Sequence, residues 1–255
     1  MTAAATDAAD GITASTAAPV LGGPNVLVFR NKFLPSWPIR RGGWAQVLTL
    51  GELCDASWPT DVHFVGYLPG EPLGKTHAPA DLGFDEAGKR TRKGKVEQVD
   101  DAFSASVLRR YDNEAVGHFR FTVRLWIADV DDPVAHVTGN PASDEWFELI
   151  TRKLERLWEK HPKVFVFTTR GGLRIILQRE TPFVIENEAD KLRFRKEDYP
   201  RFARYLGRAF DIRVDPACAN FSRLFRAPLV TRKVGDRWEG QSSRFMGDAA
   251  DLEVL

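Results

Sequence analysis

The segment from Phe119 to Asp132 constrains the fold more than any other part of this 255-residue chain. Apolar residues alternate with mostly polar ones from Phe119 to Ile127, and successive side chains of a β-strand point to opposite faces. The run then continues into Asp129 and Asp131. The alternation therefore predicts a half-buried strand with two aspartates on one face near its end.

Strand parity places these aspartates on the side that should be buried. Residues two apart share a face, so Asp129 and Asp131 lie on the same side as Phe121 and Leu125. A carboxylate on an apolar face is costly without a partner. We therefore expect either that the aspartates lie at an open strand end or that a β-bulge turns them outward.

The elements expected after this strand indicate the fold class. Ser143 precedes an amphipathic helix that His161 and Pro162 close, and the pair Gly171 and Gly172 separates two strand-like runs. The expected helix, hairpin, second helix and short strand cover 144–161, 164–178, 197–210 and 211–215. This order predicts an α/β (α+β) protein with helices packed on a mixed sheet.

The chain before this region is less regular. Residues 1–20 are rich in Ala and Thr and are expected to be a disordered lead-in. Residues 21–117 are expected to form an N-terminal α/β module in which 62–68 is a strand ended by Pro69 and Gly70. Residues 118–255 then form a second module of the same composite domain.

The net charge of +1 does not by itself indicate a polyanionic partner. The charge is uneven, however, because 13 Lys and Arg residues stand against 6 Asp and Glu residues between Asp190 and Arg237. That segment and a basic loop expected at 88–95 suit nucleic acid, although solvated helix faces give similar counts.

The cysteine count and hydropathy exclude several classes of protein. Cys54 and Cys218 are the only cysteines, so neither a disulfide framework nor a cysteine-rich zinc site is expected. No apolar run approaches the ~20 residues of a membrane span, and the N-terminus has no secretory signal pattern. We expect a cytoplasmic protein that has no membrane partner.

Three motifs carry candidate chemistry. In the first, Asp129 and Asp131 present two carboxylates on one face of a strand, and like charges at that spacing repel unless a cation or a proton lies between them. Hard oxygen ligands of this kind suit Mg²⁺ or Mn²⁺. The alternative is an Asp-rich turn that ends at Pro133.

The second motif surrounds the glycine pair. Gly171 and Gly172 allow close approach of a ligand to the backbone, while Thr168, Thr169 and a nearby arginine can bind phosphate oxygens. Arg174 lies on a strand that should be half buried, where a lone cation requires an anionic partner. The alternative is a plain hairpin with an internal salt bridge.

The third motif begins at Asp215, which follows the second helix. Two arginines, Arg223 and Arg226, come next, and Lys233 follows them. A carboxylate close to several cationic side chains is what a metal-bound triphosphate requires. An ordinary cluster of ion pairs is the alternative.

Taken in order, the three motifs resemble those of the archaeo-eukaryotic primase superfamily, in its primase-polymerase branch from phages, plasmids and mobile elements. The resemblance covers about residues 119–233. It implies Asp129, Asp131 and Asp215 as catalytic ligands of two divalent ions, Mg²⁺ or Mn²⁺, without zinc. It also implies a nucleotide-binding set of Thr168, Thr169, Gly171, Gly172, Arg174, Arg223, Arg226 and Lys233.

The resemblance further implies an RRM-like catalytic half packed on the N-terminal module, with the active site in the cleft between them. The implied activity is template-dependent DNA priming and polymerisation, with single-stranded DNA template, primer and (d)NTPs as partners and a helicase as a possible neighbour. One departure is that many members carry a histidine where this chain has Arg174.

Three rival functions remain. A non-catalytic origin-binding or replication-initiation module would keep the fold and lose the activity, which fits the departure at Arg174. A P-loop NTPase would use 69–76, but its first glycine is Pro69 here and Pro72 has no N–H for a phosphate. A TOPRIM-type enzyme also has two aspartates with the spacing of Asp129 and Asp131, but it lacks a motif like the one that begins at Asp215.

Overall fold

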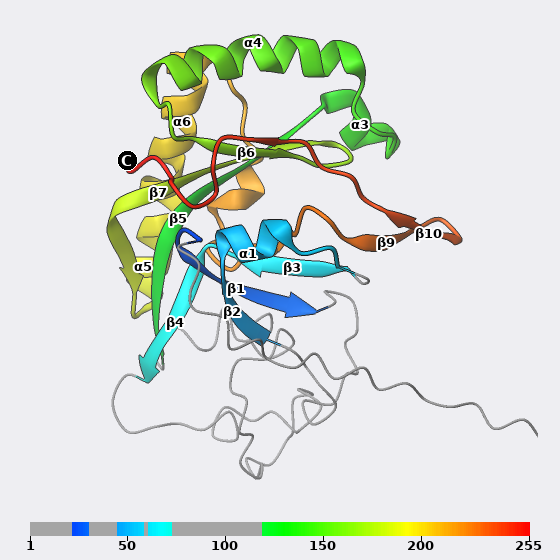
Figure 1. Cartoon of the computed structure of the whole chain (residues 1–255). Helices are drawn as coiled ribbons and strands as arrows, with labels where there is room; N and C mark the ends of the chain where they lie inside the picture. Colours follow the sequence, from blue (N-terminus) through cyan, green and yellow to red (C-terminus); the bar gives the residue numbers. More distant parts are fainter. Residues whose placement is uncertain (1–21, 31–44, 59–60, 73–118) are drawn as a thin grey trace, which may run out of the picture.

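The strand predicted from the alternation is β5 (Phe119–Asp131). The structure is a computed structural model of the chain, described for residues 22–30, 45–58, 61–72 and 119–255. β5 lies inside a five-stranded sheet of order β11-β6-β7-β5-β4 (Figure 1). The other strands of this sheet are β4 (Tyr67–Pro72), β6 (Phe165–Thr168), β7 (Gly172–Ile185) and β11 (Phe245–Met246).

Neighbouring strands of the five-stranded sheet are all antiparallel, so the predicted mixed sheet is wrong for the described residues. The helix after β5 returns the chain so that β6 runs in the same direction as β5. These two strands are not neighbours, however, because β7 lies between them and pairs antiparallel with both. The coarser prediction of a mixed α/β fold is confirmed.

The long helices cover one face of this sheet (Figure 1). α4 (Asp144–Lys160) begins where predicted, since the Ser143 hydroxyl accepts a hydrogen bond from the Trp146 N–H. α6 (Tyr199–Phe210) follows α5 (Glu188–Arg193) and a π-helical turn, 194–198. Trp126 of β5 stacks on Phe202 of α6 at 4.6 Å between ring centroids. Even-numbered residues of β5 in this region therefore face the helices.

The opposite face packs against a second, four-stranded sheet of order β2-β1-β3-β8. Its strands are β1 (Asn25–Arg30), β2 (Ala45–Thr49), β3 (Val62–Val65) and β8 (Phe225–Arg226), and α1 (Leu50–Asp55) follows β2. Phe64 contacts Phe167 of the five-stranded sheet, with ring centroids 6.5 Å apart. The core therefore contains apolar residues of both sheets.

Each sheet contains strands from both ends of the chain. The strand predicted over 62–68 is interrupted at Gly66, where the chain leaves the four-stranded sheet and enters β4. A Cβ at this position would lie 3.0 Å from the Ile127 side chain, so the crossing is tight. Pro69 and Gly70 do not end β4, which continues to Pro72.

The predicted strand over 211–215 is also absent. α6 ends at Phe210, its cap residue Asp211 has a left-handed φ of 57°, and the chain then runs extended without strand pairing. Only the Asp215 N–H bonds to β5, at 2.8 Å from the Asp129 carbonyl oxygen. A single bond of this kind is too short a pairing for a strand, yet it fixes Asp215 beside Asp129.

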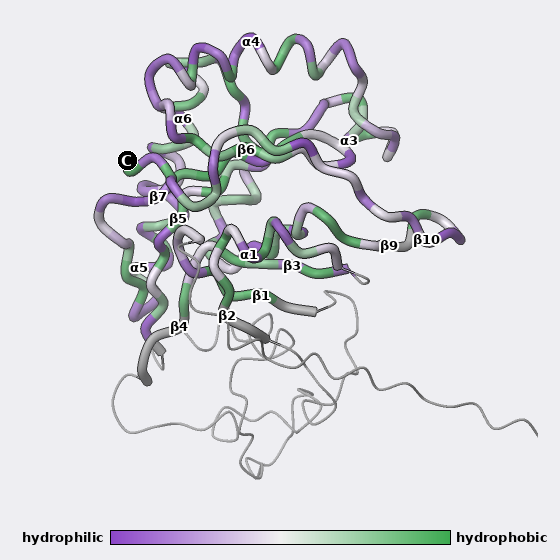
Figure 2. Tube along the Cα trace, viewed as in Figure 1, coloured by the Kyte–Doolittle hydropathy of each residue, from purple (hydrophilic) through white to green (hydrophobic). Residues whose placement is uncertain are grey.

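Two short elements complete the fold after Asp131 and after β8. α3 (Pro133–Thr138) is capped by the Asp132 carboxylate, and β9 (Thr231–Val234) pairs with β10 (Arg237–Gly240) in a separate two-stranded ribbon. In Figure 2, hydrophilic and hydrophobic residues alternate along α4, as expected for a helix with one solvated face. None of the described helices has the length and apolarity needed to cross a bilayer. The predicted lead-in and basic loop lie outside the described residues.

Candidate functional site

Asp129 lies on β5 directly opposite Arg174 of β7, and both side chains are 9% exposed. Arg174 Nε is 3.3 Å from Asp129 Oδ1, and its Nη2 is 3.4 Å from Oδ2. The expected β-bulge is not the solution to the parity problem, since the register shift of β5 falls earlier, between Val123 and Leu125. The aspartates do lie at the end of the strand, because β5 ends at Asp131 and both residues line the pocket described below. The carboxylate is stable on the inner face because a guanidinium lies opposite to it.

Arg174 makes contacts beyond Asp129. Its Nη1 donates to the Arg226 carbonyl oxygen at 2.8 Å. Its Cζ lies 5.7 Å from the ring centroid of Phe167 and 5.5 Å from that of Phe225. The internal salt bridge considered for the hairpin is therefore present. Arg174 also contributes to the wall of the pocket described below, so the pairing does not remove it from the site.

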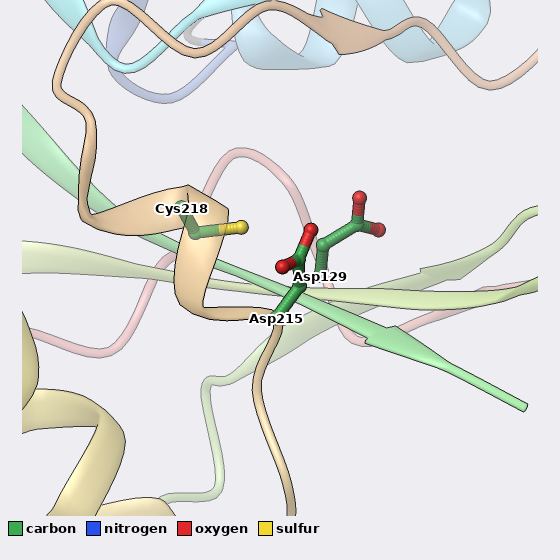
Figure 3. Close-up of side chains that lie close together, drawn as sticks. All are labelled: Asp129, Asp215 and Cys218. Atoms are coloured by element: carbon green, nitrogen blue, oxygen red, sulfur yellow. The ribbon is translucent and has the colours of Figure 1, made fainter. Parts of the chain in front are cut away.

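The third predicted acid joins Asp129 through a 3₁₀ turn, Pro216–Ala219, that begins after Asp215. The turn brings Cys218 to the same place, and Figure 3 shows its sulfur pointing toward the carboxylates of Asp129 and Asp215. One ligand atom from each of the three residues lies within 4.8 Å of the other two. This group could hold a metal ion.

The two carboxylates are the stronger ligands of the group. Burial raises the pKa of the Cys218 thiol to about 12, and the charges of Asp129 and Asp215 add to the effect. The thiol therefore stays protonated at neutral pH, whereas a metal binds the thiolate. The Oδ1 atom of Asp129 is buried and accepts no hydrogen bond within the described structure. An oxygen with unused acceptor capacity beside a second carboxylate fits a hard divalent cation.

Asp131 lies apart from this group. Its Oδ2 is 3.2 Å from Nδ1 of the exposed His136 of α3. Burial and the nearby Asp129 raise the pKa of Asp131, while His136 lowers it. The structure thus brings Asp129 and Asp215 together as predicted, adds Cys218, and leaves Asp131 next to the pair on the pocket wall.

A pocket of about 280 Å³ opens beside the acids, and we call it the arginine pocket. Five arginines and two aspartates line it, and His63 of β3 contributes from the four-stranded sheet. The charged residues of its wall are Asp129, Asp131, Arg170, Arg174, Arg223, Arg226 and Arg232. The wall has more guanidinium groups than carboxylates, which favours an anionic ligand.

The arginines differ in their pairing. Arg223 is already paired, with Nη2 3.0 Å from Asp215 Oδ2 and 4.0 Å from Asp129 Oδ2. Arg232 is crowded instead. Burial lowers its pKa, and the like charges of Arg226 and Arg170 lower it further. Arg226 is paired with Asp61, so the positive charge that attracts an anion is strongest around Arg170 and Arg232.

Arg226 is held by Asp61, a residue of the N-terminal segment. Its Nε is 2.6 Å from Asp61 Oδ1 and its Nη2 is 3.2 Å from Oδ2, a bidentate pair with fixed geometry. The backbone of Arg226 is fixed as well, because β8 pairs with β3. One wall of the arginine pocket therefore depends on the N-terminal segment.

The glycine motif has two separate functions. A Cβ on Gly172 would lie 2.1 Å from the Val130 carbonyl oxygen, so this glycine permits close packing of β7 on β5. A Cβ on Gly171 would meet only the Asp131 carboxylate, with Oδ1 at 4.0 Å, and this glycine lines the arginine pocket together with Thr169. The Thr168 hydroxyl faces elsewhere, since it accepts a hydrogen bond from the Arg244 N–H at 2.8 Å. The Lys233 backbone lies on β9, and its side chain lies outside the described structure.

Sequence reasoning missed several residues of this site. Asp61 and His63 are more than 50 residues before the first motif, and no local pattern connects them to it. A signal did exist for Cys218, because Pro216 at the start of a turn brings residues 215 and 218 together. Arg170 and Arg232 lie within the second and third motifs, but the sequence indicated no role for either. The P-loop alternative is weakened, since 69–72 belongs to β4 rather than to a loop and the remainder lies outside the described residues.

Comparison of the chain with models of protein families, with curated proteins and with solved structures finds no match in any of the three.

Proposed function

We propose that this protein is a template-dependent DNA primase-polymerase, which transfers a nucleotide from a (d)NTP to a 3′-hydroxyl. One observation carries the proposal: a buried pair of carboxylates, Asp129 and Asp215, adjoins a pocket lined by five arginines. A metal-bound triphosphate combines a divalent cation with a polyanion, and this site has complementary groups for both.

The proposed metal ligands are Asp129 and Asp215, with Asp131 completing the set through water or after a small movement. Two ions, Mg²⁺ or Mn²⁺, would activate the 3′-hydroxyl and neutralise charge on the phosphates. The 3′-hydroxyl would lose its proton to water and its oxygen would bond to the α-phosphorus, while the bond from the α-phosphorus to the bridging oxygen breaks and pyrophosphate leaves with that oxygen. No residue of the protein needs to act as a nucleophile.

The arginines would bind the triphosphate. Arg170 and Arg232 carry the least compensated charge, so they are suited to bind oxygens of the triphosphate. Arg223 would exchange Asp215 for a phosphate oxygen when a cation takes the carboxylate. This exchange keeps every charge paired, which matters because an uncompensated buried charge is costly. Single-stranded DNA template, primer and a helicase are the proposed partners, and the five-stranded sheet with α4 and α6 is the proposed RRM-like half.

A non-catalytic origin-binding module of the same fold is the second candidate. The observation that favours it is the pairing of Asp129 with Arg174 and of Asp215 with Arg223, which neutralises both acids without a metal. A primer-extension assay separates the two functions. The full chain is incubated with a primed template, dNTPs and either Mn²⁺ or Mg²⁺. Extension supports the polymerase, whereas DNA binding without any incorporation supports the second candidate.

Asp61→Asn is expected to lower kcat/KM for the incoming nucleotide by about ten- to a hundredfold. The variant loses the bidentate charge-assisted contact that holds Arg226 in position, and a contact of this kind is worth roughly 1.5–3 kcal/mol. Without this carboxylate Arg226 and Arg232 also repel each other more strongly. The two guanidinium groups then move away from the positions that orient the phosphates, which slows phosphoryl transfer. Steady-state extension kinetics with varied dNTP concentration measure the effect.

Asp198→Asn is the matched control for this prediction. Asp198 holds Arg179 in a similar bidentate pair, at 2.9 and 3.2 Å, and neither residue lines the arginine pocket. We expect both variants to lower the melting temperature and only Asp61→Asn to lower kcat/KM. Equal kinetic effects would show that Asp61 contributes to general stability alone.

A further inference from the structure

A second pocket, of about 450 Å³, adjoins the arginine pocket. Four residues line both of them, namely Thr169, Arg170, Arg232 and Gln241. Its wall is assembled from the hairpin turn, the beginning of α4 and the segment after β9. The Ala142 N–H donates to the Arg170 carbonyl oxygen at 2.8 Å, which fixes the approach to α4 against the hairpin turn.

The chemistry of this second pocket differs from that of the arginine pocket. Pro141, Ala142 and the half-buried Phe147 give it an apolar side. It has two carboxylates, Asp144 and Glu239, and three arginines, whereas the arginine pocket has two carboxylates and five arginines. A polyanion therefore prefers the arginine pocket, and an uncharged aromatic group prefers the contact with Phe147.

We propose that this second pocket holds the base and sugar of the nucleotide whose phosphates occupy the arginine pocket, and we call it the nucleoside pocket. The inference rests on the proposed function. A nucleotide is a flat aromatic base joined through a sugar to a polyanion, and the two adjoining pockets have the same two characters in the same order. The volume of the nucleoside pocket lies within the range of small-molecule sites.

Arg170 and Arg232 lie at the junction of the pockets, where the α-phosphate would sit. Arg170 is held in place by a hydrogen bond from its Nη1 to the Gly139 carbonyl oxygen. Burial and the like charges of Arg226 and Arg170 lower the pKa of Arg232, so a phosphate at the junction relieves a repulsion already present. Phe147 would lie against the base, and Asp144 and Glu239 would accept hydrogen bonds from sugar hydroxyls or from base amino groups.

Binding of dATP and of inorganic tripolyphosphate to the full chain tests the assignment. Both ligands are titrated calorimetrically with Mn²⁺ into the wild type, Phe147→Leu and Phe147→Ala. Base stacking on an aromatic side chain predicts that Phe147→Ala weakens dATP binding by about 5- to 100-fold. Phe147→Leu keeps most of the volume and should weaken dATP binding less. Tripolyphosphate has no base, so its affinity should stay within about twofold of wild type for both variants.

Leu149→Ala is the matched control, since Leu149 lies on the same helix, is 53% exposed and lines neither pocket. It should bind both ligands as the wild type does. Three results overturn the assignment: wild-type affinity of Phe147→Leu and Phe147→Ala for dATP, equal weakening of both ligands, or weaker binding of a single-stranded oligonucleotide with dATP unaffected. The last result would place template or primer in this pocket.

The outcome is separable from that of the proposed function. If dATP binding depends on Phe147 as expected but no primer is ever extended, the polymerase proposal fails while the nucleoside pocket stands. If primers are extended and Phe147→Leu and Phe147→Ala bind dATP like the wild type, the nucleoside pocket alone is wrong.

Discussion

Asp129→Asn is expected to lower the rate of template-directed nucleotide incorporation by about a thousandfold or more. Binding of a catalytic metal is worth several kcal/mol of transition-state stabilisation, and each ~1.4 kcal/mol changes a rate tenfold. An amide offers a metal one weaker oxygen and no charge. Single-turnover primer extension with Mn²⁺ measures this loss without interference from product release.

The same substitution should also destabilise the fold. In the absence of metal Asp129 is the partner of the buried Arg174 and lies 4.0 Å from Arg223. Removing one partner of a buried ion pair costs about 3–5 kcal/mol, because the other charge is left uncompensated. The argument from sequence predicts the opposite, since crowded carboxylates repel when no cation lies between them. The structure supplies two guanidinium groups, so for Asp129 we expect a lower melting temperature.

Asp131→Asn is the control for the two effects expected of Asp129→Asn, the loss of primer extension and the loss of stability. Burial and Asp129 raise the pKa of Asp131 in the folded protein, so its charged form costs stability at neutral pH. The cost is absent below the unfolded pKa of about 3.9 and is present in full above the raised folded pKa. Removing the charge should therefore keep or raise the melting temperature at neutral pH while still abolishing extension. Normal extension by Asp131→Asn would exclude it from the metal site.

The parts of the fold that sequence predicted are those that local patterns determine. The alternation before Asp129 gives β5, and a serine before an apolar stripe gives the start of α4. The glycine pair gives the turn between β6 and β7. Each of these signals spans only a few residues, so no knowledge of the distant chain is needed.

The parts that failed depend on contacts between distant residues. All four residues of β3 are buried, so they show no alternation that would reveal the crossing at Gly66. The sheet order depends on where the hairpin docks, and a strand's own sequence does not specify its neighbours. The pairing of Asp61 with Arg226 joins residues 165 positions apart. Sequence motifs thus locate the acids and arginines, while their partners follow only from the assembled sheets.

Arg174 is where the two interpretations of the site can be measured against each other. If Arg174 is a phosphate ligand, Arg174→Ala should raise the KM for the incoming nucleotide about ten- to a hundredfold. If Arg174 is the buried partner of Asp129, the same substitution should lower the free energy of unfolding by about 3–5 kcal/mol. Arg174 both lines the arginine pocket and pairs with Asp129, so we expect both effects in Arg174→Ala.

Arg174→Lys should recover only part of either effect. The guanidinium uses Nη1 for the Arg226 carbonyl oxygen and Nε and Nη2 for Asp129, and one ammonium group cannot reproduce that fork. The lysine keeps the positive charge, so the stability loss should be smaller than in Arg174→Ala. Thermal melts and nucleotide titrations on the same preparations give both quantities.

A double-mutant cycle with Asp129→Asn and Arg174→Met isolates the pair itself. Each single variant leaves one buried charge without its partner, whereas the double variant removes both charges, so its loss of stability should be much smaller than the sum of the two single losses. Additive losses would show that Asp129 and Arg174 do not stabilise each other. A large drop in melting temperature for Arg174→Ala with unchanged nucleotide affinity would instead confine Arg174 to the core. The remaining arginines of the pocket, led by Arg170 and Arg232, would then bind the triphosphate.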